Sequence, residues 1–168
     1  MSESYHCLKF ENECLSFMNQ VKLPLIEEYV VTDNYERIAE AIEKLEIRGA
    51  PAIGIAAAYA LAFSMKKISE QKVFETAFYR LASTRPTAVN LFWALNSMKK
   101  VYLENKEAAN IYEILKNEAV RIHNDDIEKC FRIGENGLSL FKKKTTVLTH
   151  CNTGKLATGG NGTAFNVI

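Results

Sequence analysis

The longest apolar run of this 168-residue sequence is APAIGIAAAYALAF, from Ala50 to Phe63. Its fourteen residues are too few to cross a bilayer, which needs about 20, so we interpret the run as a helix buried in a protein core. Pro51 suits the first turn of such a helix, where no amide proton is needed. Small side chains on every side of this helix allow its neighbours to pack closely. The run therefore predicts a helical core around which the rest of the chain folds.

Helices are expected on both sides of this core. The preceding helix begins with Asp33 and Glu36, whose spacing resembles a capping box, and it ends near Gly49. Further along the chain, apolar residues recur at helical spacing. Three more helices are expected over residues 70–82, 86–102 and 107–133, and two short strands of a hairpin or meander over residues 14–18 and 28–32. The pattern predicts a small β-hairpin followed by a mainly helical domain.

The period of the pattern changes after Gly137. A β-branched strand is expected over Thr145–Cys151, followed by a glycine-rich turn and a helix that begins at Thr163. Strand, glycine-rich loop and helix open an α/β unit. We therefore expect two domains, residues 1–137 and 138–168, in a protein of the α/β class. One strand and one helical turn cannot complete a sheet, so we interpret the second domain as truncated and the chain as an N-terminal portion.

The composition argues against several classes of protein. Lysine and arginine total 21, and aspartate and glutamate total 20, so the net charge is +1. Nucleic-acid-binding proteins usually carry a basic surplus and membrane surfaces attract polybasic segments, so we expect neither partner. The four cysteines form no CxxC pair, and the N-terminus has no apolar leader. We therefore expect a cytoplasmic protein with reduced thiols.

The glycine-rich turn matches neither common nucleotide-binding fingerprint. Leu156 follows Gly154-Lys155 where the phosphate-binding loop requires serine or threonine, and Phe165 stands where the dinucleotide motif requires its third glycine. The loop still offers many backbone N–H groups at the start of a helix. Such a loop either cradles an anion or simply makes a tight turn.

Cys151 is the strongest single candidate for chemistry. It ends the predicted strand and precedes the glycine-rich loop, where α/β folds place their ligand crevice. A thiol beside a helix N-terminus is a usable nucleophile or proton carrier. The alternative is a small buried side chain, since cysteine often packs as a hydrophobe. His150 points to the opposite face of a strand, so no direct pair with Cys151 is expected.

Two arginines stand in parallel settings. Arg48 precedes Gly49-Ala50-Pro51, and Arg85 directly precedes Pro86, so each is expected at the N-terminus of a helix that a proline begins. A helix N-terminus attracts anions, and a guanidinium adds a charged fork suited to phosphate. The alternative is that each arginine caps or salt-bridges a neighbouring helix. Two such arginines together with a cysteine loop favour a phosphate-binding active site.

Separate segments of the sequence together resemble the S-methyl-5-thioribose-1-phosphate isomerase family. They are residues 15–20 (LSFMNQ) with Leu23-Pro24, residues 47–59 (IRGAPAIGIAAAY), residues 85–91 (RPTAVNL) and residues 148–154 (LTHCNTG). The resemblance covers nearly the whole chain in the family's order. It implies an N-terminal, mainly helical domain followed by a Rossmann-like catalytic domain, related to the regulatory subunits of translation initiation factor 2B.

The family isomerises an aldose 1-phosphate to a ketose 1-phosphate in methionine salvage, without a redox cofactor or a metal. The resemblance implies that Arg48, Gly49, Ala50 and Arg85 contact the phosphate and sugar, and that Cys151 is the catalytic thiol. It also implies a homodimer as the assembly. The family's acid/base aspartate and an asparagine–lysine pair lie further along its chain. This chain alone is therefore expected to be inactive.

Three alternative functions stay open at this point. A 5-deoxyribose-1-phosphate isomerase would share every motif quoted above. A ribose-1,5-bisphosphate isomerase fits the RGAPAIG segment, residues 48–54, less well. A non-catalytic regulatory subunit of the initiation-factor type would have the fold without this chemistry, and the presence of Cys151 with both arginines argues against it.

Overall fold

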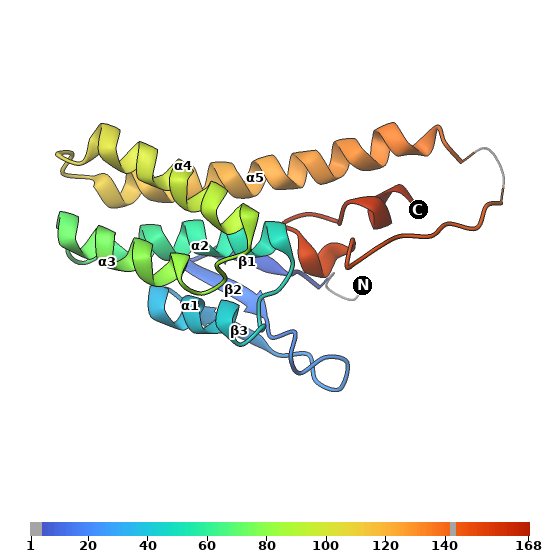
Figure 1. The fold of residues 1–168 in the computed structure, drawn as a ribbon, viewed down its shortest axis with the longest axis horizontal. Helices are drawn as coiled ribbons and strands as arrows, with labels where there is room; N and C mark the ends of the chain where they lie inside the picture. The colour runs from blue at the N-terminus through green and yellow to red at the C-terminus, as the bar shows by residue number, and fades with distance from the viewer. Residues whose placement is uncertain (1–4, 142–143) are drawn as a thin grey trace.

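A computed structural model describes residues 5–141 and 144–168 of the chain (Figure 1). In this part of the chain the elements are β1 (Leu8–Glu11), β2 (Cys14–Met18), β3 (Tyr29–Thr32), α1 (Tyr35–Glu43), α2 (Ala50–Ser64), α3 (Gln71–Ala82), α4 (Val89–Asn105), α5 (Ile111–Leu138) and the short 3₁₀ helices η1 (Lys155–Ala157) and η2 (Ala164–Val167). The α/β class is confirmed as helices with a small antiparallel sheet. No helix within the described ranges is both long and apolar enough to cross a bilayer.

Helix α2 lies at the centre of the fold, as the apolar run predicts. Every residue from Ala52 to Ser64 is buried, and the helix contacts α1, α3, α4 and α5. Figure 1 shows α4 and α5 on one side of it and α1 on the other. Gly54 permits the closest approach, because a Cβ there would stand 2.8 Å from the Asn90 carbonyl oxygen of α4. Small residues thus let neighbouring backbones approach α2, as expected.

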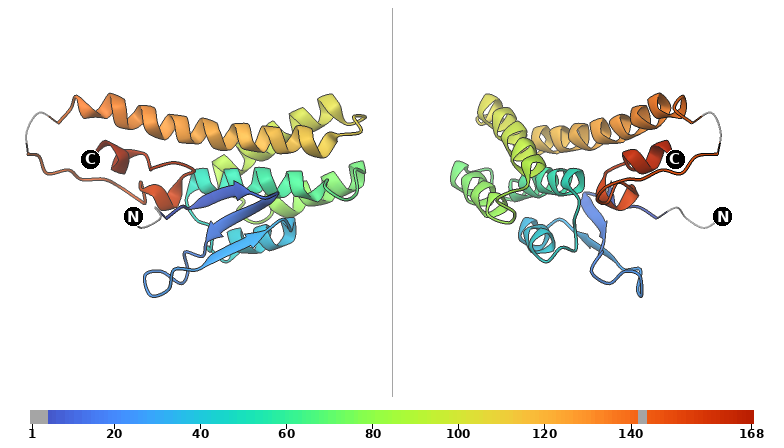
Figure 2. Two further views of the ribbon diagram at one scale, coloured as in Figure 1. Left: turned by 180° about the vertical axis from the view of Figure 1, so that it is seen from behind. Right: turned by 45° about the vertical axis from the view of Figure 1, so that its right-hand side comes forward.

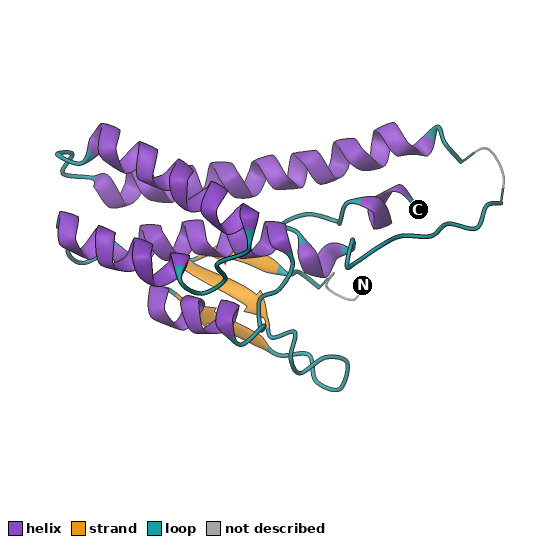
Figure 3. Cartoon of the chain, viewed as in Figure 1, coloured by secondary structure: helices purple, strands orange, loops and turns teal. Residues whose placement is uncertain are grey.

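The three strands form one antiparallel sheet in the order β1-β2-β3, which Figure 2 shows from behind the helices and Figure 3 marks in orange. Phe17 of β2 is buried and stands opposite Leu8 and Val30. Phe10 of β1 stacks on Tyr59 of α2 with the ring centroids 4.9 Å apart. The sheet is therefore joined to the helical core through side chains. The two expected strands are confirmed, and β1 makes the predicted hairpin a meander.

Several predicted helix boundaries are wrong by a few residues. Asn34, not Asp33, caps α1, because its Oδ1 accepts from the Glu36 amide at 2.9 Å, whereas Asp33 pairs with Lys66. Helix α1 ends at Glu43 rather than near Gly49. Helix α4 begins at Val89, and Pro86 lies in the preceding turn. Pro86 therefore indicates that a helix begins nearby, but it is not the first residue of that helix.

The predicted strand Thr145–Cys151 is not formed. Residues 144–150 are exposed and assigned to no strand, and Cys151 has a φ of +64°. A lone strand has no neighbour to satisfy its backbone groups, and among the described residues the only sheet is β1-β2-β3, which does not include this segment. The expected helix after Thr163 is the single 3₁₀ turn η2. Gly134 and Gly137 of α5 face Asn166 and Val167, so η2 packs on the end of α5.

Candidate active site

A cavity of about 460 Å³ lies where the N-terminus of α2 meets the C-terminal segment, residues 144–168. Its lining residues are Arg48, Gly49, Ala50, Pro51, Cys151, Asn152, Ala157, Thr158 and Thr163. The structure thus brings together four of the five candidate residues, from parts of the sequence a hundred residues apart. We call it the Arg48 cavity. Helix η1 of the C-terminal segment contacts α2.

Gly49 sets the distance between the two walls of the Arg48 cavity. Its φ is +104°, a conformation that favours glycine. A Cβ at this position would stand 2.5 Å from the Ala157 Cα, so any side chain would collide with η1. The Gly49 carbonyl also accepts from the Ile53 amide at 3.0 Å, which begins α2. Glycine is therefore required here both for the turn into α2 and for the close approach of η1.

Arg48 is held by Gln20, a residue that the sequence analysis did not select. The Arg48 Nε donates to the Gln20 Oε1 at 3.4 Å, and the Gln20 Nε2 donates to the Leu156 carbonyl at 2.7 Å. Cys7 donates its thiol proton to the same carbonyl at 3.1 Å. Burial raises the pKa of Cys7 to about 12, so that thiol stays protonated. These bonds join the sheet end, the α2 N-terminus and η1.

Cys151 is exposed and lies on the rim of the Arg48 cavity. The alternative that it packs as a small buried hydrophobe is therefore wrong in this structure. Two bonds order the turn that follows it: the Gly154 amide donates to Asn152 Oδ1 at 3.2 Å, and the Thr163 amide donates to the Thr153 carbonyl at 2.8 Å. Cys151 thus lines the same cavity as Arg48.

Arg85 lies outside the Arg48 cavity. It is half-buried in the turn before α4, where its carbonyl accepts from the Ala88 amide at 3.0 Å. Within residues 5–141 and 144–168, neither Arg48 nor Arg85 forms an ion pair with a carboxylate. The alternative that they salt-bridge neighbouring helices does not hold for the described residues.

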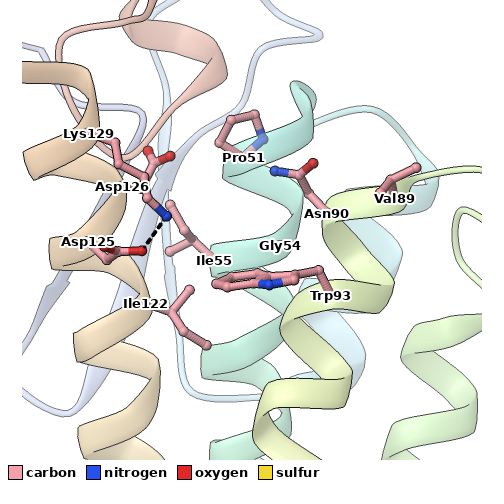
Figure 4. A pocket seen from close by; sticks show the side chains of 10 residues that line it. All are labelled: Pro51, Gly54, Ile55, Val89, Asn90, Trp93, Ile122, Asp125, Asp126 and Lys129. Carbon is pink, nitrogen blue, oxygen red and sulfur yellow. Dashed lines mark hydrogen bonds and ion pairs between the residues drawn. The ribbon is translucent and has the colours of Figure 1, made fainter. Parts of the chain in front are cut away.

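A second cavity, of about 300 Å³, opens on the other side of Pro51 between α2, α4 and α5 (Figure 4). Lys129 closes one of its edges, 2.6 Å from Asp125 Oδ2 and 5.8 Å from the centre of the Trp93 ring. Asp126 accepts from the Gly159 amide at 2.7 Å. Burial raises the pKa of Asp126, while that amide acts in the opposite direction. The charged groups of this cavity are therefore already engaged by the protein.

Metal ligation finds no support among the described residues, which include no cluster of three or more histidine, cysteine, aspartate or glutamate side chains suited to an ion. The nearest approach to such a group is on α5, where His123, Asp126 and Cys130 follow one another along the helix. His123 and Asp126 are engaged instead by Tyr59 and Gly159, at 3.2 Å and 2.7 Å. These side chains tie α5 to its neighbours.

Comparison with known proteins places this chain among related sequences and folds. Residues 46–168 match the Initiation factor 2 subunit family. The methylthioribose-1-phosphate isomerase of Thermotoga maritima is 46% identical over 168 residues, which cover 96% of this chain and 48% of that protein. The protein of the same name from Geobacter sulfurreducens is 43% identical, with 98% and 50% covered. This chain thus spans about half the length of these curated relatives.

Two crystal structures share the fold. The 5-methylthioribose 1-phosphate isomerase of Pyrococcus horikoshii superposes with a TM-score of 0.89 at 36% identity, over 98% of this chain and 48% of that one. The delta subunit of translation initiation factor eIF-2B from A. fulgidus superposes with a TM-score of 0.83 at 34% identity, over 98% of this chain and 50% of that one. The fold alone therefore does not separate an isomerase from an initiation-factor subunit.

Proposed function

The chain belongs to the Initiation factor 2 subunit family, and from this premise we propose that it is the N-terminal part of a methylthioribose-1-phosphate isomerase. One observation carries the proposal: Arg48, Gly49 and Ala50 line one cavity together with the exposed thiol of Cys151. The identity of 46% to the Thermotoga maritima isomerase supports it. A regulatory subunit would need the fold but not this pairing of a guanidinium with a thiol.

The proposed reaction converts S-methyl-5-thioribose 1-phosphate to S-methyl-5-thioribulose 1-phosphate. The phosphate occupies the anomeric carbon, so the sugar cannot open freely to an aldehyde, and the enzyme must break the ring bond between C1 and oxygen with the phosphate in place. Hydrogen moves from C2 to C1, the C2 hydroxyl becomes a carbonyl, and the ring oxygen gains a proton. Arg48 anchors the dianionic phosphate, Arg85 joins it once the second half of the enzyme closes the site, and Cys151 moves a proton near C1 and C2.

The missing parts of this chemistry belong to the second half of the proposed enzyme. There we place the acid/base aspartate and the asparagine–lysine pair that the resemblance implies. In the complete protein, residues 1–137 form the N-terminal domain, and residues 138–168 open a Rossmann-like domain in which 145–151 pair as a strand. We propose a homodimer in the cytoplasm that takes a small sugar phosphate and needs no cofactor. The half-length match to the relatives supports placing the missing groups in a second half of the protein.

The direct test is an isomerase assay of the chain alone and of the chain mixed with the C-terminal half of the Thermotoga maritima relative. We expect no turnover alone and measurable turnover after mixing, with S-methyl-5-thioribose 1-phosphate preferred over 5-deoxyribose 1-phosphate and ribose 1,5-bisphosphate. Full activity of the chain alone would show that its chemistry differs from that proposed. Preference for 5-deoxyribose 1-phosphate would assign the sister isomerase. Phosphate binding without any turnover after mixing would favour the regulatory subunit.

A further inference from the structure

Gln20 is a buried amide between the two walls of the Arg48 cavity. Its side chain is almost fully enclosed, with 1% exposed, and it does not line the cavity itself. Its backbone amide donates to the Glu46 carbonyl at 3.0 Å, which fixes its position against the turn that carries Arg48. We propose that Gln20 is the positioning residue of the phosphate site, which orients the Arg48 guanidinium for an anion.

The chemistry of a carboxamide explains why glutamine serves at this place. The Arg48 Nε needs an acceptor, and the Leu156 carbonyl needs a donor. A carboxamide offers both on one rigid group, whereas a carboxylate is acceptor-only and a thioether is a poor partner for either. Both bonds are part-buried: Gln20 is buried, whereas Arg48 is exposed. Losing either bond would leave one end of the buried Gln20 carboxamide unsatisfied, which costs more than the loss of a bond between exposed groups.

In this arrangement, one nitrogen of the Arg48 guanidinium, Nε, is hydrogen-bonded to the protein. The Nε bond to Gln20 restricts rotation of the side chain and leaves the two terminal nitrogens for the fork geometry that binds phosphate oxygens. An oriented side chain loses less entropy when the anion binds. Gln20 thus acts on affinity through Arg48, without touching the anion. This inference rests on the proposed function only in taking Arg48 as a phosphate ligand.

A comparison with Cys7 distinguishes two roles for Gln20: orienting Arg48, or only holding η1 in place. Its thiol donates to the same Leu156 carbonyl that Gln20 binds, at 3.1 Å. The Cys7 Sγ also accepts from the Gln20 Nε2 at 3.5 Å, but no bond links Cys7 to Arg48 itself among the described residues. If Gln20 served only to hold η1 in place, the loss of Cys7 would resemble the loss of Gln20. If Gln20 orients Arg48, only the loss of Gln20 weakens anion binding.

The experiment measures binding of inorganic phosphate to the chain by calorimetry at constant ionic strength. Gln20→Met keeps the volume of the side chain but removes its three side-chain bonds, to Arg48, Leu156 and Cys7, and we expect about five- to tenfold weaker binding. Cys7→Ala and the surface variant Gln71→Met should stay within about twofold of the parent chain. Should Gln20→Met fail to fold by circular dichroism, Gln20→Glu replaces it. That carboxylate pairs with the guanidinium and competes with phosphate, so binding should again weaken.

A double-mutant cycle then tests the route through Arg48. Arg48→Lys retains the charge but lacks the Nε donor, so Gln20→Met should have almost no further effect in that background. An equal effect of Gln20→Met in both backgrounds, or equal weakening by Cys7→Ala, would overturn the inference. If Arg48→Ala leaves phosphate binding unchanged, the site assignment in the proposed function fails instead.

In the mixed isomerase assay, Gln20→Met should raise KM and leave kcat within about threefold, a split that a merely unstable variant would not show.

Discussion

The core around α2 and the C-terminal segment, residues 144–168, differ in how their apolar side chains are covered. Residues of α2 are buried on every side, whereas Leu148, in the middle of the predicted strand, is 97% exposed. A helix satisfies its backbone within itself and needs only neighbours to cover its faces, and α1, α3, α4 and α5 supply them. A strand needs a second strand beside it. The difference teaches that a helix is stabilised by whichever elements cover its faces, whereas residues 145–151 form no strand without a second strand beside them.

The largest expected effect tests whether the segment carries the chemistry. In the mixed isomerase assay, Cys151→Ser should lower kcat by at least about 100-fold, as for a lost proton-transferring group. The melting temperature should not change, because Cys151 is exposed. The matched control is Cys14→Ser in β2, which should retain turnover. Near-normal activity of Cys151→Ser would remove the thiol from the mechanism.

The next largest effect is expected for Arg48, which lines the Arg48 cavity at the N-terminus of α2. Arg48→Ala should weaken phosphate binding by about 10- to 100-fold, as expected for the loss of a charge-assisted contact. Arg85→Ala serves as the comparison, since Arg85 lies outside the Arg48 cavity. In the chain alone it should change phosphate binding little. In the mixed protein it should raise KM, if the second half closes the site over the turn before α4. Equal loss from both variants in the chain alone would show that they share one site already.

Glycines in the two regions provide a comparison of stability. In the core, a Cβ at Gly54 would stand 2.8 Å from a backbone oxygen, so Gly54→Ala should cost about 1–3 kcal/mol despite its better helix propensity. In α5, a Cβ at Gly137 would meet the Val167 side chain at 2.2 Å. We expect Gly137→Ala to release η2 and leave the melting temperature of the core unchanged. Thermal unfolding and hydrogen exchange of residues 164–167 measure the two effects separately. A common loss of melting temperature would mean that core and segment unfold together.

The sequence patterns predicted the core better than they predicted the segment or the site. Every long helix was located approximately, α2 from its uninterrupted apolar run and α5 from its repeating apolar face, because helical contacts are local. Strand β1 was missed as a separate strand, since its turn to β2 uses Asn12 and Glu13 at positive φ in place of the glycine that usually marks such a turn. The start of α4 was predicted too early, at Pro86, because a proline suits the turn before a helix as well as its first turn. The prediction of a strand over residues 145–151 was wrong, because a strand forms only beside other strands and the local sequence does not show whether these are present.

The site was predictable where its residues form contiguous motifs. Arg48, Gly49 and Ala50 are adjacent, and Cys151 stands beside a glycine-rich loop, so their chemistry can be read from short segments. Gln20 and Asp126 could not be found in this way. Each reaches its partner across a long sequence separation, Gln20 to Leu156 and Asp126 to Gly159. No spacing rule connects such residues, because the tertiary fold alone makes them neighbours.

The smallest expected effect is a pH dependence where α5 meets the C-terminal segment. Burial lowers the pKa of His123 below its ordinary value of 6.5, so the unfolded chain binds a proton more readily than the folded chain. The stability that neutral His123 contributes is present above pH 6.5 and is lost as the pH falls toward the lower folded-state pKa. Tyr59, whose hydroxyl is 3.2 Å from Nδ1, and Asp126 face the ring. Burial raises the pKa of Asp126, which gives the opposite trend as the pH rises.

Substitution of His123 isolates its share of this dependence. His123→Gln cannot titrate and can still bond to Tyr59, whereas Asp126 and all other carboxylates are unchanged. Urea unfolding between pH 7.5 and 5 should show a smaller loss of stability in His123→Gln than in the parent chain. His150→Gln, at an exposed position of the segment, should keep the parent slope. Because Gly159 leaves room beside the His123 ring, where a Cβ would be 2.6 Å from Cδ2, protonation there should loosen the segment before the core. A protection factor for the Gly159 amide, corrected for intrinsic exchange, that stays constant from pH 7.5 to 5 would contradict that order, and identical slopes in His123→Gln and the parent chain would assign the pH dependence to other groups.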